Sequence, residues 1–137
     1  MNNNGSYALV FGVSVFDICG FTDNDYRSND SNPGRVRTSF GGVCRNIAEC
    51  MARVGVNTKF ISVLGDDETG KSILQHSKEM NYNMEDSLIV EGGHTPTYMA
   101  VLDHFGEMVS AVVDMKIIDE FTTEFIDSKA EIIKNAE

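Results

Sequence analysis

The residues from Gly65 to Ser72 have the types and the spacing of a phosphate-binding loop. They read GDDETGKS and match the pattern G-x-x-x-x-G-K-S at every defined position. An apolar run precedes them and a helical pattern follows. In that context, loop amides and a lysine can bind the phosphates of a nucleotide. From this segment alone, one hypothesis is a P-loop nucleotide-binding protein.

A run of carboxylates argues against that chemistry. Asp66, Asp67 and Glu68 would lie close to a polyphosphate and repel it, and no separate acidic strand stands out to hold a compensating Mg²⁺. The alternative is a helix N-terminus whose acidic residues are favoured by the helix dipole. A dinucleotide-binding turn is also disfavoured, because residues 12–17 read GVSVFD rather than G-x-G-x-x-G.

Strands and helices alternate along the rest of the chain. Apolar runs at residues 7–13, 58–64 and 87–90 indicate strands. Further helices are expected to begin near Asp67 or Thr69 and at Thr122. A buried face on a helix that begins after two glycines is predicted by apolar residues with helical spacing: Ile47, Cys50, Met51 and Val54. This order predicts an α/β fold with a parallel sheet and helices on its faces.

A β-hairpin is predicted near the C-terminal end of this pattern. Apolar runs at 97–102 and 108–113 flank a polar segment in which Gly106 suits a tight turn. Residues 35–40 predict a short exposed strand, and residues 22–33 a loop. Because the hairpin does not fit a strand–helix alternation, we expect it to project from the parallel sheet.

Composition limits the classes of partner. The chain has 137 residues, a hydrophobic fraction of 42% and a net charge of −10, so we expect one domain that binds neither nucleic acid nor an anionic membrane. Cys19, Cys44 and Cys50 form neither a disulfide pattern nor a zinc-binding pattern, and we expect no metal site. The N-terminus lacks the features of a signal peptide, which favours a cytoplasmic location.

Residues 31–36 and 41–49 resemble the signature of the PfkB (ribokinase-like) family of carbohydrate kinases. The matching features are the pair Gly41-Gly42, then Asn46, Ala48 and Gly55. The segment 65–70 resembles the Gly-Asp-Asp-x-x-Gly element of the same family, so the apparent P-loop has a second explanation. The resemblance implies a ribokinase-like three-layer sandwich with a partial parallel sheet. It also implies a projecting β-lid, with strands at about 35–40 and 97–113.

Finer features resemble pseudouridine kinases within this family. They are the segments SNPGRV at 31–36, RNIAE at 45–49 and TPTYMAVLD at 95–103. The resemblance implies an enzyme that transfers phosphate from ATP, with Mg²⁺, to the 5′-hydroxyl of pseudouridine. Two alternatives stay open. One is a ribose, fructose or adenosine kinase, and the other is a sugar-binding or dimerisation module without catalysis.

The resemblance also assigns substrate-binding roles. Asp17 would accept hydrogen bonds from sugar hydroxyls, since a carboxylate is a strong double acceptor. Gly41 and Gly42 would let the backbone approach the sugar, and Asn46 would offer it a donor and an acceptor. The alternatives are a loop or cap aspartate, an ordinary turn and a helix-surface asparagine.

Other positions are less regular. Arg45 would contact the substrate or pair with an acidic neighbour, and Thr97 and Met99 would contact the sugar from the lid. Val15 stands where many relatives have asparagine, and Cys44 where this subgroup has glycine. The first removes one polar contact, and the second could narrow the pocket.

The catalytic segment of the family is not found in this sequence. A Gly-x-Gly-Asp motif, whose aspartate is the base in the family, does not occur in the 137 residues, so no catalytic residue is predicted. Residues 1–137 would therefore form the N-terminal, sugar-binding part of such a kinase, inactive alone and binding no ATP or Mg²⁺. Lids in the family often pair between subunits, so the resemblance also allows a homodimer through the lid.

Overall fold

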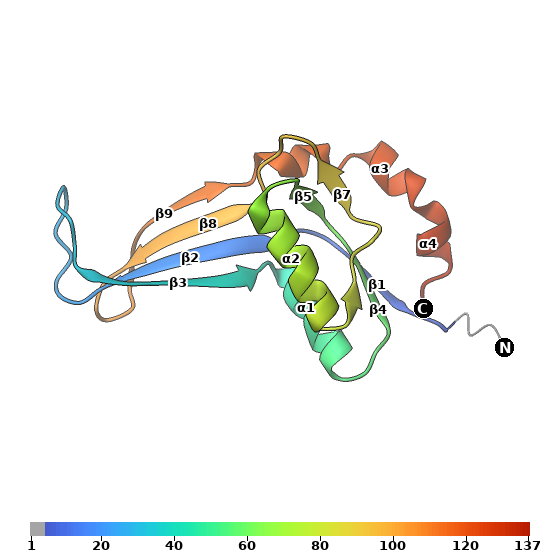
Figure 1. The fold of residues 1–137 in the computed structure, drawn as a ribbon, viewed down its shortest axis with the longest axis horizontal. Coiled ribbons are helices and arrows are strands. Elements are labelled where there is room, and N and C mark those ends of the chain that lie inside the picture. Colours follow the sequence, from blue (N-terminus) through green and yellow to red (C-terminus); the bar gives the residue numbers. More distant parts are fainter. Residues whose placement is uncertain (1–4) are drawn as a thin grey trace.

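The computed structural model describes residues 5–137, which form a body and a long projecting sheet (Figure 1). A parallel sheet lies in the body, with strand order β1-β4-β6. Its strands are β1 (Ala8–Phe11), β4 (Thr58–Ile61) and β6 (Tyr82–Asn83). A second parallel pair consists of β5 (Val63–Gly65) and β7 (Leu88–Val90). The predicted α/β class with parallel strands is confirmed.

Helices pack around these strands. Figure 1 shows the first two helices together near the centre of the view and the last two at the end that holds both termini. The helices are α1 (Val43–Arg53), α2 (Glu68–Glu79), a 3₁₀ helix (Lys116–Glu120), α3 (Thr123–Ser128) and α4 (Ala130–Lys134). The core joins α1 and α2 to the parallel sheet through Ala48, Phe60, Leu64, Ile73, Tyr82 and Met84. Among residues 5–137, no helix has the length and apolarity needed to cross a membrane.

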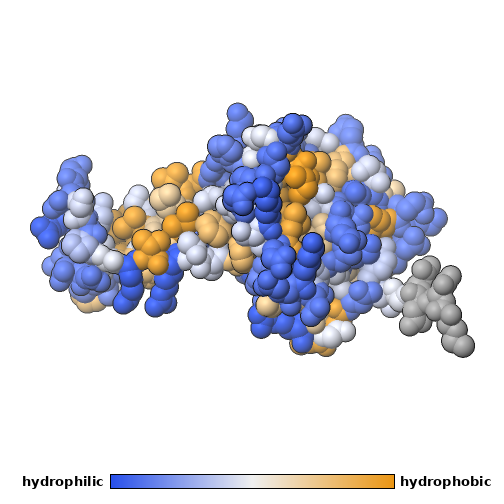
Figure 2. Space-filling model, in the orientation of Figure 1, coloured by the Kyte–Doolittle hydropathy of each residue, from blue (hydrophilic) through white to orange (hydrophobic). Residues whose placement is uncertain are grey.

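The projecting sheet has four strands in the order β3-β2-β8-β9. They are β2 (Val15–Thr22), β3 (Gly34–Gly41), β8 (Thr97–Leu102) and β9 (Met108–Asp114). β2 pairs antiparallel with β3 and parallel with β8, which pairs antiparallel with β9. Figure 2 shows polar side chains at the tip of this sheet and apolar ones between the tip and the body. The predicted hairpin is thus two strands of a larger projecting sheet.

Two predictions about elements were wrong. The strand expected at 7–13 ends at Phe11, and β2, which was not predicted, begins at Val15. The apolar stripe of α1 does not face the core, since Ile47 is 47% exposed and Val54 79% exposed. The buried face of α1 holds Arg45 and Ala48 instead. The small Ala48 side chain is fully buried and allows close helix-to-sheet packing.

Candidate acceptor-binding site

Asp17 is the third residue of β2, and this start of β2 pairs with the end of β3, from which the chain turns into α1. Paired residues on neighbouring strands share a face of the sheet. The strand register therefore places Ser39 of β3 and Tyr98 of β8 beside Asp17. The carboxylate reaches the backbone where β3 ends: a Cβ built on Gly41 would lie 2.8 Å from Asp17 Cγ, and closer still to Oδ2. Only a glycine leaves room for this carboxylate.

Gly42 turns the chain from β3 into α1. Its φ of 91° lies in the left-handed region that favours glycine. A Cβ there would lie 3.2 Å from Ser14 Cα and would overlap the Val13 carbonyl oxygen. Gly42 is also the N-cap of α1, and no side chain among residues 5–137 caps this end. Amides of the first helical turn are therefore available beside the Asp17 carboxylate.

The electrostatics of Asp17 suit a ligand-binding carboxylate. Burial raises the pKa of Asp17 above its usual value, and the positive charge of Arg45 lowers it in part. No hydrogen bond from the described residues contributes to this balance. A partly desolvated carboxylate without a donor is a site that hydroxyl groups of a ligand could fill.

Asn46 and Arg45 differ in exposure. Asn46 is exposed on the first turns of α1, and its Oδ1 accepts a hydrogen bond from Arg45. Arg45 is 6% exposed and donates from Nε to the Gly41 carbonyl oxygen at 3.1 Å. It also pairs with Glu49. Of the two predicted roles for Arg45, the structure shows the pairing with an acidic neighbour.

Thr97 and Met99 are not brought together with Asp17. They pair with Phe16 and Ile18 of β2, which lie on the opposite face of the projecting sheet. Sequence reasoning missed Tyr98, which pairs with Asp17 and lies on its face. Strand alternation places residues 97 and 99 on one face of β8 and residue 98 on the other. Which of these faces carries Asp17 depends on the register between β8 and β2, which the sequence does not reveal.

The segment 65–72 is engaged in structural contacts. The Asp67 carboxylate caps α2 by accepting from the Gly70 amide at 2.7 Å, and it also accepts from the Thr95 amide at 2.8 Å. Lys71 is exposed and pairs with Glu68. The Gly70 amide, which a phosphate would need as a donor, already donates to the Asp67 carboxylate. These residues therefore do not fit a nucleotide. Among residues 5–137, no group of three or more His, Cys, Asp or Glu side chains could hold a metal ion.

The two positions that depart from the family pattern lie at the same junction. Val15 is 8% exposed and offers no polar group. Cys44 packs on Gly12, where a Cβ would lie 2.6 Å from Cys44 Cβ. The cysteine side chain thus occupies space beside the first strand.

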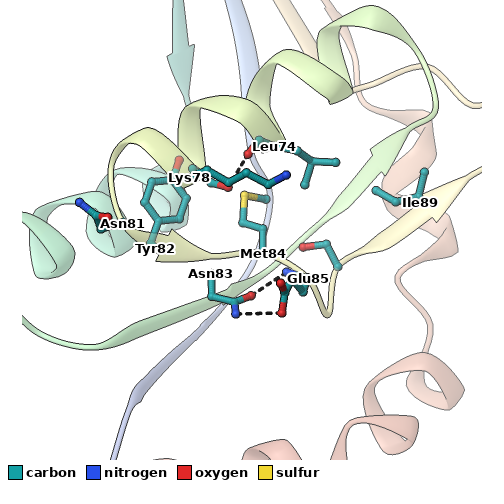
Figure 3. A pocket seen from close by; sticks show the side chains of 10 residues that line it. Leu74, Lys78, Asn81, Tyr82, Asn83, Met84, Glu85 and Ile89 are labelled. Carbon is teal, nitrogen blue, oxygen red and sulfur yellow. Dashed lines mark hydrogen bonds between the residues drawn. The ribbon is translucent and has the colours of Figure 1, made fainter. Parts of the chain in front are cut away.

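A separate cavity of about 480 Å³ lies between α2 and the segment that contains β6. Figure 3 shows Leu74, Met84 and Ile89 among its wall residues. Glu85 bonds there with Asn83, so these polar groups satisfy one another. None of the predicted binding residues lines this cavity.

Comparisons with known proteins agree on one family. The model of the pfkB family of carbohydrate kinases matches residues 6–137. Pseudouridine kinase of Escherichia coli (strain K12) is 34% identical over 130 residues, which cover 95% of this chain and 42% of that protein. The chain therefore spans less than half the length of this relative.

Solved structures show the same fold. A candidate sugar kinase from Clostridium perfringens has a TM-score of 0.91 and 61% identity, covering 98% of this chain and 43% of that one. Ribokinase from Giardia lamblia has a TM-score of 0.71 and 20% identity, covering 80% and 36%, which shows a ribokinase-like fold. Together with the family match over residues 6–137, these likenesses show that the chain belongs to the pfkB family of carbohydrate kinases.

Proposed function

We propose that this chain is the acceptor-binding part of a kinase that phosphorylates the 5′-hydroxyl of a nucleoside, with pseudouridine as the first candidate. The observation that carries the proposal is the Asp17 carboxylate. This carboxylate is partly desolvated and accepts no hydrogen bond from the described residues. It lies against Gly41, beside the N-terminus of α1. The 34% identity with a pseudouridine kinase favours that nucleoside over free ribose or fructose.

Each part of the site has a task in this proposal. Asp17 accepts hydrogen bonds from two sugar hydroxyls, and the first-turn amides after Gly42 donate to sugar oxygens. Asn46 lies on the same helix end and can reach the sugar edge. Tyr98 covers the sugar from the lid sheet on the face of Asp17. The lid excludes water from the reaction.

Phosphoryl transfer is assigned to a part that this chain does not contain. Among the described residues, the loop at 65–72 does not suit a nucleotide, because the Gly70 amide donates its hydrogen bond to Asp67. We therefore expect the chain alone neither to bind ATP and Mg²⁺ nor to turn over. We also propose that the whole kinase works in the cytoplasm.

The test uses two forms of the protein. Calorimetry on the 137-residue chain would compare pseudouridine, uridine, adenosine, ribose and fructose. A chimera in which this chain replaces the matching part of the 61% identical Clostridium perfringens protein would be assayed for phosphorylation of the same compounds. We expect pseudouridine to bind most tightly and to be phosphorylated only by the chimera. Preference for a free sugar would refute the nucleoside assignment, and turnover by the chain alone would refute the division of labour.

Gly41→Ala supplies a sharp internal check in both forms. Its Cβ would overlap the Asp17 carboxylate, so binding should fall at least about tenfold. Gly20→Ala in the same sheet is the control, because its Cβ would lie 3.9 Å from the Ala100 carbonyl oxygen and meet no clash. Equal effects of the two variants would contradict a site at Gly41.

A further inference from the structure

Arg45 is a charged side chain almost removed from solvent. Its relative exposure is 6%, and residues of this type are rarely buried unless paired. Its side chain bonds to the Gly41 carbonyl oxygen and to Asn46 Oδ1 at the start of α1, and to Glu49 Oε2 one turn further along the helix. The first of these fixes the peptide that lies against Asp17.

Glu49 collects donors from both helices. It accepts from Arg45 and Arg53 on α1 and from His76 Nε2 on α2, the last at 3.0 Å. Burial would raise the pKa of Glu49, but hydrogen bonds from His76, Arg45 and Arg53 lower it to about 2. Glu49 is therefore ionised across the working range of pH and can hold Arg45 in place throughout.

His76 returns the chain of contacts to the same turn. Its ring lies 4.8 Å, centroid to centroid, from the ring of Phe40, and Phe40 directly precedes Gly41. The contacts thus form a closed ring through Gly41, Arg45, Glu49, His76 and Phe40. The turn from β3 to α1 is held on one side by a hydrogen bond and on the other by ring packing.

We propose that Arg45 and Glu49 are positioning residues for acceptor binding, which hold the Gly41-Gly42 turn against the Asp17 carboxylate without touching the ligand. The inference rests on the proposed function for the identity of the ligand. It assigns Arg45 a task different from direct substrate contact. It also explains why a buried ion pair occupies the core-facing side of α1, where apolar residues would pack as well.

The polar and charged groups around Asp17 provide a measurement, the pKa of Asp17, that does not depend on stability alone. On its face, β3 contributes Ser39 and, one pleat further, Arg37, while β8 contributes Tyr98. Arg45 of α1 is the positive charge that lowers the pKa of Asp17. Loss of Arg45 should therefore raise that pKa further.

Three variants separate positioning from general stability. Arg45→Met removes the bond to Gly41, and Arg45→Lys keeps the charge but cannot bond to Gly41 and Glu49 with one planar group. Arg53→Met is the matched control, since Arg53 pairs with the same Glu49 but its side chain is 61% exposed and does not reach the turn. Calorimetry would measure binding of pseudouridine and ribose to each variant of the chain. A ¹³C NMR titration would follow the Asp17 carboxyl carbon.

We expect Arg45→Met to weaken binding about tenfold and Arg45→Lys to give an intermediate loss, while Arg53→Met stays within about twofold. The Asp17 pKa should rise in Arg45→Met and stay unchanged in Arg53→Met. Wild-type binding by Arg45→Met, or equal losses in Arg45→Met and Arg53→Met, would overturn the proposal. If Arg45→Met does not fold, the same comparison of Arg45→Lys with Arg53→Met decides. If the wild-type chain binds neither compound, the proposed function fails, whereas the Asp17 titration still tests the ring of contacts.

Discussion

At the scale of single residues, binding and stability make opposite demands on Asp17. Burial raises the pKa of this carboxyl, and no described hydrogen bond compensates for the lost water. A group whose folded-state pKa is raised favours the folded state when protonated. Its contribution is therefore fully present below the unfolded pKa and is lost as pH rises through the folded value. At neutral pH the ionised side chain costs stability that a bound sugar would recover.

Asp17→Asn should therefore lose acceptor binding while the fold becomes slightly more stable. At pH 7 we expect a gain of about 0.5 kcal/mol in the free energy of unfolding, kept small by solvent access to the carboxyl. Urea unfolding of both proteins from pH 3 to pH 8 would measure this gain. The difference should shrink below the ordinary aspartate pKa of 3.8. A variant that is less stable than the wild type at pH 7 would show that Asp17 serves the fold.

The sequence identified most residues of the candidate site but not which residues lie next to them in the structure. Asp17, Gly41, Gly42 and Asn46 could be named from a signature, and the structure places them around one junction. The lid residue that shares a face with Asp17 could not be identified from the sequence, because a shift of one residue along a strand moves a side chain to the other face. Arg45 had two roles that only its burial and its bond to Gly41 could separate.

At the scale of elements, the turn before α2 fastens the lid to the body. Asp67 caps α2 and accepts from both the amide and the hydroxyl of Thr95, two residues before β8 begins. Thr95 Oγ1 accepts in turn from the Gly65 amide at the end of β5. The acidic loop that resembles a nucleotide site is thus an anchor for the lid strand.

Asp67→Ala should loosen this anchor. Loss of a cap and of two partly buried hydrogen bonds predicts a destabilisation of about 2 kcal/mol, with faster amide exchange in β8. Burial would raise the pKa of Asp67, but bonds from Thr95 and Gly70 lower it, so its contribution is present above the usual pKa of 3.8 and is lost as pH falls through the folded value.

Hydrogen–deuterium exchange and thermal unfolding would measure both effects. Lys71→Ala is the control, because Lys71 is exposed and pairs only with the exposed Glu68. If the two variants are equally stable and β8 exchanges alike, the anchor is not at Asp67. Nucleotide binding that depends on Lys71 would instead revive the P-loop hypothesis.

The elements differed in how far the sequence could define them. The cap at Asp67 and the buried run at 58–64 have strong local signals, and both appear in the structure, although the run is divided into β4 and β5. β2 lacked such a signal because its apolar side chains fall on both faces, with Phe16 and Ile18 on one and Cys19 and Phe21 on the other, and its aspartate resembled a loop residue. The helix face of α1 was misread because its core contacts are made by an arginine and small side chains.

At the scale of the whole molecule, the face of the projecting sheet opposite Asp17 carries several exposed apolar side chains. Val36, Met99 and Val112 on this face are 70%, 49% and 67% exposed, and Ile18 lies among them by register. Exposed apolar surface of this kind often marks an interface. We propose that two copies of the chain pair through this face.

Val112→Lys should then give a monomer. A lysine on this strand would place a charge in the middle of the apolar contact and would have to be desolvated on pairing. Light scattering after size exclusion would measure the mass of the wild type and of the variant. Val54→Lys, 79% exposed on α1, is the control and should keep the wild-type mass. A monomeric wild type would remove the dimer and leave the acceptor site untouched.

The position of Asp17 within β2 divides the candidate site between two parts of the molecule. The Asp17 carboxylate, which we propose binds the acceptor, belongs to the projecting sheet, whereas the amides after Gly42 belong to the helix of the body. A sugar bound by both would link the projecting sheet to the body. Binding at the site would then reduce the motion of the projecting sheet relative to the body, out to the loop at residues 23–33.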